Sequence, residues 1–271
     1  MRVLPSLTRI TNRLQARGRL LQKKAGLELR RAIARKPLWV DYGWLKLPYH
    51  GDGDWQELYY HLDGGQWWEA EKNALSAYAR PGCTAVDVGA NLGFLTALLS
   101  RLVGESGHVH SFEPLPRVYQ KLVEVIEANS LGNVTAHNFG CGEKAGVMPL
   151  HVTKSTGNSS LRLRAGLVSQ VRETQDVQLV ALDNYLGPKL TRLDFLKIDT
   201  EGFEDCVLYG ARELISRFLP VIYLELTSEY LAASRRAVSI LGELGYRFAE
   251  EPVLEECHNG QNFLAFPAGY R

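Results

Sequence analysis

The sequence predicts an α/β domain built on a mostly parallel sheet. Short β-rich runs alternate with helical stretches from about residue 67 onward. A glycine-rich turn follows the first buried run, at the point where a strand would lead into a helix. The chain has 271 residues, of which 45% are hydrophobic and 23% are charged. This composition suits one large domain with a short appendage and excludes disordered, collagenous and disulfide-knotted proteins.

The expected strands are apolar runs bounded by turn residues. They cover residues 84–88, 108–112, 134–139, 194–198 and 221–226, followed by two short closing strands, YRF at 246–248 and NFLAF at 262–266. Helices are expected at residues 67–80, 94–102, 116–129, 203–218 and 234–244. Because helical crossovers connect parallel strands, ligands are expected at the carboxyl ends of the strands.

Residues 1–36 form a basic segment. They contain eleven Lys and Arg against one acidic residue, Glu28, a formal charge of +10; since the whole chain carries +1, the remainder carries −9. Apolar side chains from Val3 to Leu21 share one helical face and basic side chains occupy the other. This pattern predicts an amphipathic helix that packs on the domain or, alternatively, makes a peripheral membrane contact or serves as an organelle-targeting peptide. It contains no aromatic residue for base stacking, so no nucleic-acid partner is expected.

Residues 37–66 are predicted to form an aromatic-rich cap of hairpins and loops. All five tryptophans lie between Trp39 and Trp68, with tyrosines and turn-forming glycines among them. Such rings either stack on a sugar or planar substrate beside a cleft, or simply cover a core. The main domain is expected at residues 67–271, with an inserted pair of extended segments around an exposed polar loop at residues 147–186.

The cysteine pattern and the apolar runs bear on the compartment. The four cysteines show no CxxC spacing, which favours a reducing compartment such as the cytoplasm over a zinc site or a disulfide framework. The longest apolar runs last about eight residues, whereas a membrane-spanning helix needs about 20. A cytoplasmic protein is therefore expected, with peripheral attachment to a membrane as the alternative.

The turn DVGANLG, from Asp87 to Gly93, has the position of a cofactor loop. A dinucleotide fingerprint requires a glycine where this chain has Asn91, and a P-loop requires a lysine after Gly93. Glu113 ends the second strand, where a carboxylate accepts hydrogen bonds from a ribose diol. Ribose without pyrophosphate indicates an adenosyl ligand, and the acidic Asp87 favours one with a cationic tail. S-adenosylmethionine has these properties.

Four motifs occur in order: VDVGANLGF, HSFEPLP, FLKIDTEGFE and YLEL. Together they resemble the FkbM family of S-adenosylmethionine-dependent methyltransferases, over about Trp67 to Leu226. The resemblance implies a class I methyltransferase fold, Rossmann-like, with seven strands of which the last is antiparallel. It also implies the cofactor contacts: the methionine moiety would lie among Asp87, Gly89, Asn91 and Gly93, the ribose against Glu113, and the adenine beside Pro114, Asn138 and Phe139.

Charged residues gather at the ends of two later strands. Lys197 and Asp199 share one strand face, Glu201 follows in the loop, and Glu225 lies near the end of the next strand. Because an unpaired buried charge is unfavourable, a mutually satisfied network is expected, with either a structural or a catalytic role. In the catalytic interpretation Asp199, Glu201 and Glu225 are the candidate bases for a hydroxyl proton, and Lys197 tunes their charge or acts as the base itself.

The three carboxylates could instead gather a Mg²⁺ that orients two sugar hydroxyls, although no metal ligand is assigned. Enzymes that methylate the amines of bases typically carry Asn or Asp, two prolines and an aromatic residue at this strand end; the DTEG of this chain departs from that pattern. The sequence therefore predicts an O-methyltransferase acting on a hydroxyl of a small molecule or glycan. An NAD-type oxidoreductase and a non-catalytic, membrane-recruited binding protein on the same fold are the alternatives.

Overall fold

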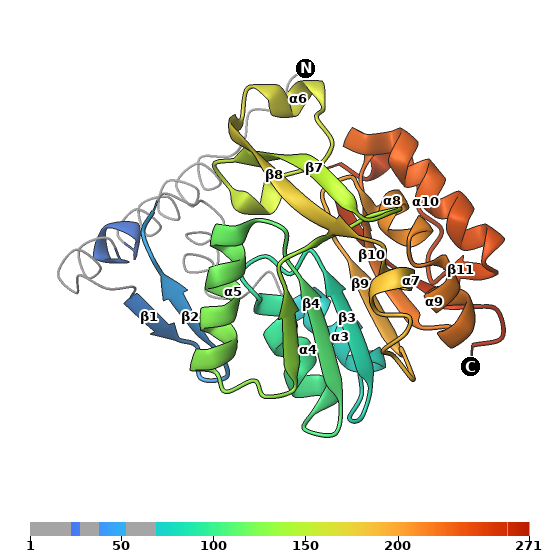
Figure 1. The fold of residues 1–271 in the computed structure, drawn as a ribbon, viewed down its shortest axis with the longest axis horizontal. Helices are drawn as coiled ribbons and strands as arrows, with labels where there is room; N and C mark the ends of the chain where they lie inside the picture. Colours follow the sequence, from blue (N-terminus) through green and yellow to red (C-terminus); the bar gives the residue numbers. More distant parts are fainter. Residues whose placement is uncertain (1–22, 28–37, 53–68, 259, 271) are drawn as a thin grey trace, which may run out of the picture. The chain divides into compact units, whose positions relative to one another are not determined.

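The computed structural model describes residues 23–27, 38–52, 69–258 and 260–270 (Figure 1). The chain divides into two units, Met1–Trp67 and Trp68–Arg271. In the first unit residues 23–27 are helical, and β1 (Leu38–Asp41) pairs antiparallel with β2 (Lys46–Tyr49). Most of the basic segment and half of the aromatic cap lie outside the described residues, so the predicted domain boundaries and the peripheral membrane contact stay predictions.

The second unit contains the predicted sheet. It has seven strands in the order β11-β12-β10-β9-β3-β4-β5. All neighbours from β10 to β5 are parallel, whereas β12 runs antiparallel to both β10 and β11. The class I fold with an antiparallel last strand is thereby confirmed. The strands are β3 (Thr84–Val88), β4 (His108–Phe112), β5 (Val134–His137), β9 (Phe195–Ile198), β10 (Val221–Leu226), β11 (Tyr246–Phe248) and β12 (Gln261–Pro267).

Helices cover both faces of this sheet, because each crossover between parallel strands passes over one face. Helix α4 packs against β3 and β4, α5 against β5, and α8 against β10. Among the described residues no helix has the length and apolar composition needed to cross a bilayer. The larger helices are α3 (Glu69–Tyr78), α4 (Phe94–Val103), α5 (Pro116–Ala128), α8 (Glu204–Tyr209), α9 (Arg212–Phe218) and α10 (Leu231–Glu243), and short 3₁₀ turns are η2 (Ser228–Tyr230) and η3 (Leu254–Glu256).

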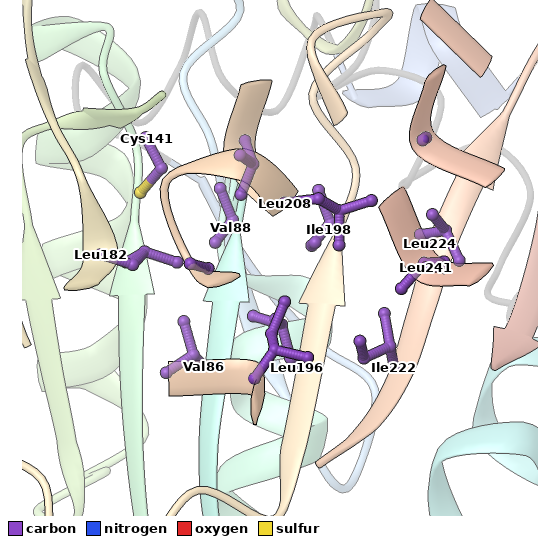
Figure 2. Packing of buried hydrophobic residues seen from close by; sticks show 14 of the residues in the cluster. Val86, Val88, Cys141, Leu182, Leu196, Ile198, Leu208, Ile222, Leu224 and Leu241 are labelled. Carbon is purple, nitrogen blue, oxygen red and sulfur yellow. The ribbon is translucent and has the colours of Figure 1, made fainter. Parts of the chain in front are cut away.

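Strand alternation separates an apolar face from a polar one. In the centre of the sheet every second side chain enters the main apolar cluster, where it meets Leu208 of α8 and Leu241 of α10 (Figure 2). The residues between them, Asp87 and Lys197, therefore point to the opposite face. The strand residues in the cluster are Val86, Val88, Leu196, Ile198, Ile222 and Leu224.

The prediction of one continuous helix over residues 203–218 is wrong, because this stretch is broken into α8 and α9 at Gly210. A Cβ on Gly210 would lie 2.0 Å from the carbonyl oxygen of Gly142. The carboxylate of Asp183 then accepts the backbone N–H groups of Glu213 at 3.0 Å and Leu214 at 2.8 Å, which starts the second helix. Contacts distant in sequence thus override local helical periodicity.

The insertion between β5 and β9 forms a second sheet. Strand β7 (Gly146–Thr153) pairs antiparallel with β8 (Val171–Val180), and β6 (Gly140–Cys141) pairs parallel with β8. The loop between β7 and β8 is packed in part rather than exposed throughout, as Thr156 and Ser160 are buried. The expectation of a simple exposed loop is therefore corrected. The insertion also contains η1 (Thr156–Asn158), α6 (Ala165–Val168) and α7 (Leu182–Tyr185).

Candidate active site

The glycine loop joins β3 to α4 in a conformation that glycine favours. Gly89 and Gly93 have φ angles of +78° and +84°. A Cβ on Gly89 would lie 1.8 Å from the carbonyl oxygen of Asp199, so only glycine allows the loop to approach the end of β9. The N–H groups of Gly89 and Ala90 donate to the carbonyl of Phe112 at 3.0 and 2.9 Å. The loop is therefore fixed against both neighbouring strands.

Asp87 lies beneath this loop and is fully buried. Its Oδ2 accepts a hydrogen bond of 2.6 Å from the hydroxyl of Thr96, and its Oδ1 is 3.0 Å from Nζ of Lys197. The same ammonium donates to the carbonyl of Gly89 at 2.8 Å and lies 3.6 Å from Oδ2 of Asp199. Lys197 thus lies within reach of two carboxylates and of the carbonyl of Gly89, and its role as charge-tuning group or as base stays a prediction.

Glu113 follows β4 and lies directly beside the glycine loop. It is 7% exposed. Its Oε2 accepts the N–H of Asn91 at 3.0 Å, and its Oε1 accepts the N–H of Leu115 at 2.9 Å. Burial raises the pKa of Glu113 to about 7, against the opposing effect of the two N–H groups and of Lys197. Each carboxylate oxygen can still accept a second hydrogen bond.

The remaining predicted cofactor residues lie next to Glu113. The amide of Asn138 donates to the carbonyls of Glu113 at 2.8 Å and Pro114 at 3.1 Å. These bonds fix the path of the chain beyond β4. Phe139 is partly buried and packs on the main apolar cluster, with its ring centroid 5.4 Å from that of Tyr185. Asn138 and Pro114 therefore lie beside Glu113, whereas Phe139 is turned at least in part toward the core.

The predicted acidic residues meet at the other side of the loop. One carboxylate oxygen from each of Asp199, Glu201 and Glu225 lies within 4.8 Å of the others. Burial, followed by the charge of Asp199, raises the pKa of Glu201 and of Glu225 well above the usual range. We call these three residues the acidic edge. It is suited to hold a proton or, alternatively, a divalent cation.

The turn that carries Glu201 is held by residues to which the sequence gave no role. Glu201 has a φ of +56°, in the left-handed region. The buried carboxylate of Glu204 accepts the N–H of Thr200 at 2.9 Å and the N–H of Gly202 at 3.1 Å, which fixes the turn on both sides. An acidic residue at the first position of a helix was the available signal for this contact.

The insertion also reaches this turn. The hydroxyl of Ser160 donates to the carbonyl of Glu201 at 2.6 Å. Arg162 donates to the carbonyl of Gly202 at 2.8 Å and forms a bidentate pair with Asp205, at 2.7 and 2.9 Å. The polar loop of the insertion is thus tied to the acidic edge. Residues some 40 positions apart make these contacts, so sequence periodicity carries no signal for them.

Comparison with known proteins identifies the family. The model of the methyltransferase FkbM domain matches residues 87–248, which is more than half of the chain. The chain belongs to this family. Its matched region runs from Asp87 at the glycine loop to the last residue of β11, so it contains the loop, Glu113 and the acidic edge.

Two curated relatives share about a third of their aligned residues with the chain. Methyltransferase 1 of Beauveria bassiana (strain ARSEF 2860) is 31% identical over an alignment of 143 residues, and the match covers 46% of this chain and 57% of the relative. Methyltransferase sdnD of Sordaria araneosa is 30% identical over 156 residues, covering 47% and 60% of the two chains. The chain therefore spans less than two thirds of the length of either relative.

Solved structures show more distant similarity. Methyltransferase FkbM from Methylobacillus flagellatus KT is 19% identical, with a TM-score of 0.47, and the match covers 77% of this chain and 52% of that one. Fibrillarin from Aeropyrum pernix, solved with natively bound S-adenosyl-L-methionine, is 13% identical with a TM-score of 0.45, covering 73% and 74% of the two chains.

Proposed function

We propose that this FkbM family member is an S-adenosylmethionine-dependent O-methyltransferase whose acceptor is a hydroxyl of a small molecule or glycan. One observation carries the proposal: the glycine loop lies between a ribose-type carboxylate, Glu113, and the acidic edge. Gly89 approaches Asp199 closely, and Asn91 is bonded to Glu113. A cofactor bound on this loop would therefore contact both.

The residues present fit S-adenosylmethionine. The glycines at 89 and 93 let the loop pack against Asp199 and Leu122, where a Cβ would clash, and Glu113 retains acceptor capacity for a ribose diol. Asn91 occupies the place where a dinucleotide-binding loop needs glycine, and no basic side chain lies in the loop to meet a pyrophosphate. When bound, S-adenosylmethionine supplies a methyl group on a positively charged sulfur.

On the cofactor side the residues bind and orient. Glu113 would accept the ribose hydroxyls, and Pro114, Asn138 and Phe139 would border the adenine. Gly89, Asn91 and Gly93 would surround the methionine moiety. Asp87 and Lys197 hold the loop from the protein interior, because both are buried and contact Thr96 and the carbonyl of Gly89. They are assigned as positioning residues.

On the acceptor side the acidic edge would accept the proton of the attacking hydroxyl. A carboxylate whose pKa is raised is a stronger base than an ordinary one. Burial, followed by the charge of Asp199, raises the pKa of Glu201 and of Glu225, and Asp199 lies 3.6 Å from the ammonium of Lys197. An oxygen acceptor suits this arrangement, since a hydroxyl must lose a proton during transfer. Mg²⁺ shared by the three carboxylates is the alternative.

Calorimetric titration of the purified chain with S-adenosylmethionine and, separately, with NAD tests the cofactor. We expect micromolar binding of the first and none of the second. A screen of hydroxylated acceptors with a radiolabelled methyl donor, run with EDTA and with added Mg²⁺, then tests the reaction and the metal. Binding of NAD alone would instead support an oxidoreductase, and binding of neither would support a non-catalytic protein on this fold.

A further inference from the structure

A pocket of about 500 Å³ lies on the polar face of the sheet, within the second unit. Its walls come from α3, β10, β12 and the residues after β11. This volume is within the range of about 300–1,000 Å³ that small-molecule sites occupy. The lining residues used below are Glu71, Ala74, Tyr223, Ala249, Asn262 and Leu264, and a second carboxylate, the exposed Glu250, lines the pocket as well.

One wall of the pocket presents an unsatisfied acceptor. Oε2 of Glu71 is buried and has no hydrogen-bond partner in the part of the chain that the structure describes. Burial raises the pKa of Glu71, its own backbone N–H opposes this rise, and the nearby charge of Asp199 adds to it. Leaving a buried polar atom without a partner costs about 1–3 kcal/mol, so native proteins rarely do so without a reason. A ligand that donates a hydrogen bond would satisfy this oxygen.

The pocket and the acidic edge share strand β10. Tyr223 and Glu225 are two positions apart on β10 and therefore point to the same face. Glu225 lies opposite Asn262 on β12, so the strand that forms the pocket wall also borders the acidic edge. Burial, followed by the charges of Glu71, Asp199 and Glu225, raises the pKa of Tyr223, so the pocket and the acidic edge are electrostatically coupled.

The chemistry of the wall favours a neutral polyol over an amine. Asn262 and Tyr223 each offer a donor and an acceptor, whereas Glu71 offers acceptors when ionised. A sugar hydroxyl both donates and accepts, so it can pair with all three groups. An ammonium only donates and would leave the amide N–H without a partner. Ala74 and Leu264 supply apolar surface for the carbon face of a ring.

We propose that this pocket binds the methyl acceptor, and that the acceptor is a polyhydroxylated molecule of the sugar class whose hydroxyl donates to Glu71. The proposal rests on the proposed function, because it places the acceptor where one of its hydroxyls would lie beside the acidic edge.

The test measures binding of methyl α-D-glucopyranoside to the full chain by saturation-transfer NMR, with 1,4-diaminobutane as the cationic comparison. We expect millimolar binding of the glycoside and weaker binding of the diamine. Ala74→Trp fills the pocket and should weaken glycoside binding about tenfold or more, because the occupied volume is lost. Ala77→Trp is the matched control: Ala77 is exposed on the same helix, and this variant should bind normally.

Two further variants test the same pocket in case Ala74→Trp does not fold. Ala249 is exposed and lines the pocket, so Ala249→Trp should fold and still block the glycoside. Glu71→Gln should weaken the glycoside several-fold. S-adenosylmethionine affinity and the melting temperature (Tm) should stay unchanged in all four variants.

Absence of glycoside binding, preference for the diamine, or glycoside binding that Ala74→Trp and Ala249→Trp leave intact would each overturn the proposal. Failure of the wild-type chain to bind S-adenosylmethionine, with glycoside binding intact, would overturn the proposed function alone.

Discussion

The carboxylates on the two sides of the glycine loop have different surroundings. On one side of the loop, each oxygen of Glu113 accepts a backbone N–H, and burial raises the pKa of this carboxyl group to about 7. At the acidic edge, Glu201 and Glu225 face each other and Asp199, and mutual repulsion adds to burial in raising their pKa. The carboxylate of Glu113 is held by two backbone N–H groups, whereas the acidic edge crowds three carboxyl groups together with the ammonium of Lys197 3.6 Å from Asp199.

Under the proposed function, this difference would separate cofactor binding from the transfer reaction. A carboxylate already oriented by two N–H groups needs no rearrangement to accept ligand hydroxyls, which favours tight and geometrically defined binding. Carboxylates that repel one another bind a proton readily, which is the property of a general base. Within the network predicted at the strand ends, Lys197 pairs with Asp199 and, in addition, with Asp87, and a catalytic role for the network stays a prediction.

The largest expected effect is on turnover. Glu201→Ala should lower the methyl-transfer rate about 10²–10⁴-fold, as is usual for loss of a general base, while S-adenosylmethionine affinity stays within about twofold. The rate is measured with an acceptor from the radiolabel screen and the affinity by calorimetry. Glu105→Ala removes an exposed carboxylate and should change neither. Equal loss of affinity and rate in Glu201→Ala would show that the two sides are not separate.

The next effect is on cofactor affinity. Glu113→Ala should weaken S-adenosylmethionine binding about 100-fold, because two charge-assisted hydrogen bonds to the ribose are lost. Glu127→Ala, an exposed carboxylate on α5, is the control and should bind normally. In the wild type, affinity should fall as the pH drops below about 7, since protonated Glu113 accepts fewer hydroxyl donors. An unchanged dissociation constant in Glu113→Ala would remove the ribose assignment.

The smallest effect is on stability. A carboxyl group whose pKa is raised on folding stabilises the protein at low pH, and this contribution is lost as the pH rises through the raised pKa of Glu225. Glu225→Gln removes the charge, so Tm should increase by roughly 2–4 °C for each 1 kcal/mol relieved near neutral pH. The gain should vanish near pH 4, below the unfolded-state pKa.

Thermal melts across that pH range measure the effect of Glu225→Gln. Glu255→Gln is the control, because Arg235 holds the pKa of the exposed Glu255 below its usual range and no gain is expected there. A Tm gain for Glu225→Gln that is independent of pH would contradict the charge repulsion at the acidic edge.

The sequence by itself determined the fold class and the identity of the candidate site. Alternating strands and helices predict a parallel sheet because each element buries one face or one stripe. Strand ends then bring Asp87, Glu113, Lys197 and Asp199 to one edge, whatever the details of packing. The sequence also predicted the glycine loop, and the structure gives the reason for one of its glycines: Gly89 approaches the neighbouring strand so closely that a side chain has no room.

Only the tertiary structure decided the contacts between distant segments. The break at Gly210, the bonds from Ser160 and Arg162 to the turn of Glu201, and the pocket beside Glu71 all join residues far apart in the chain. Periodicity describes how one element presents its faces, and it carries no information on which distant group will meet that face. Which carboxylates find partners, and which remain charged beside a ligand, therefore depends on the packing of the folded chain.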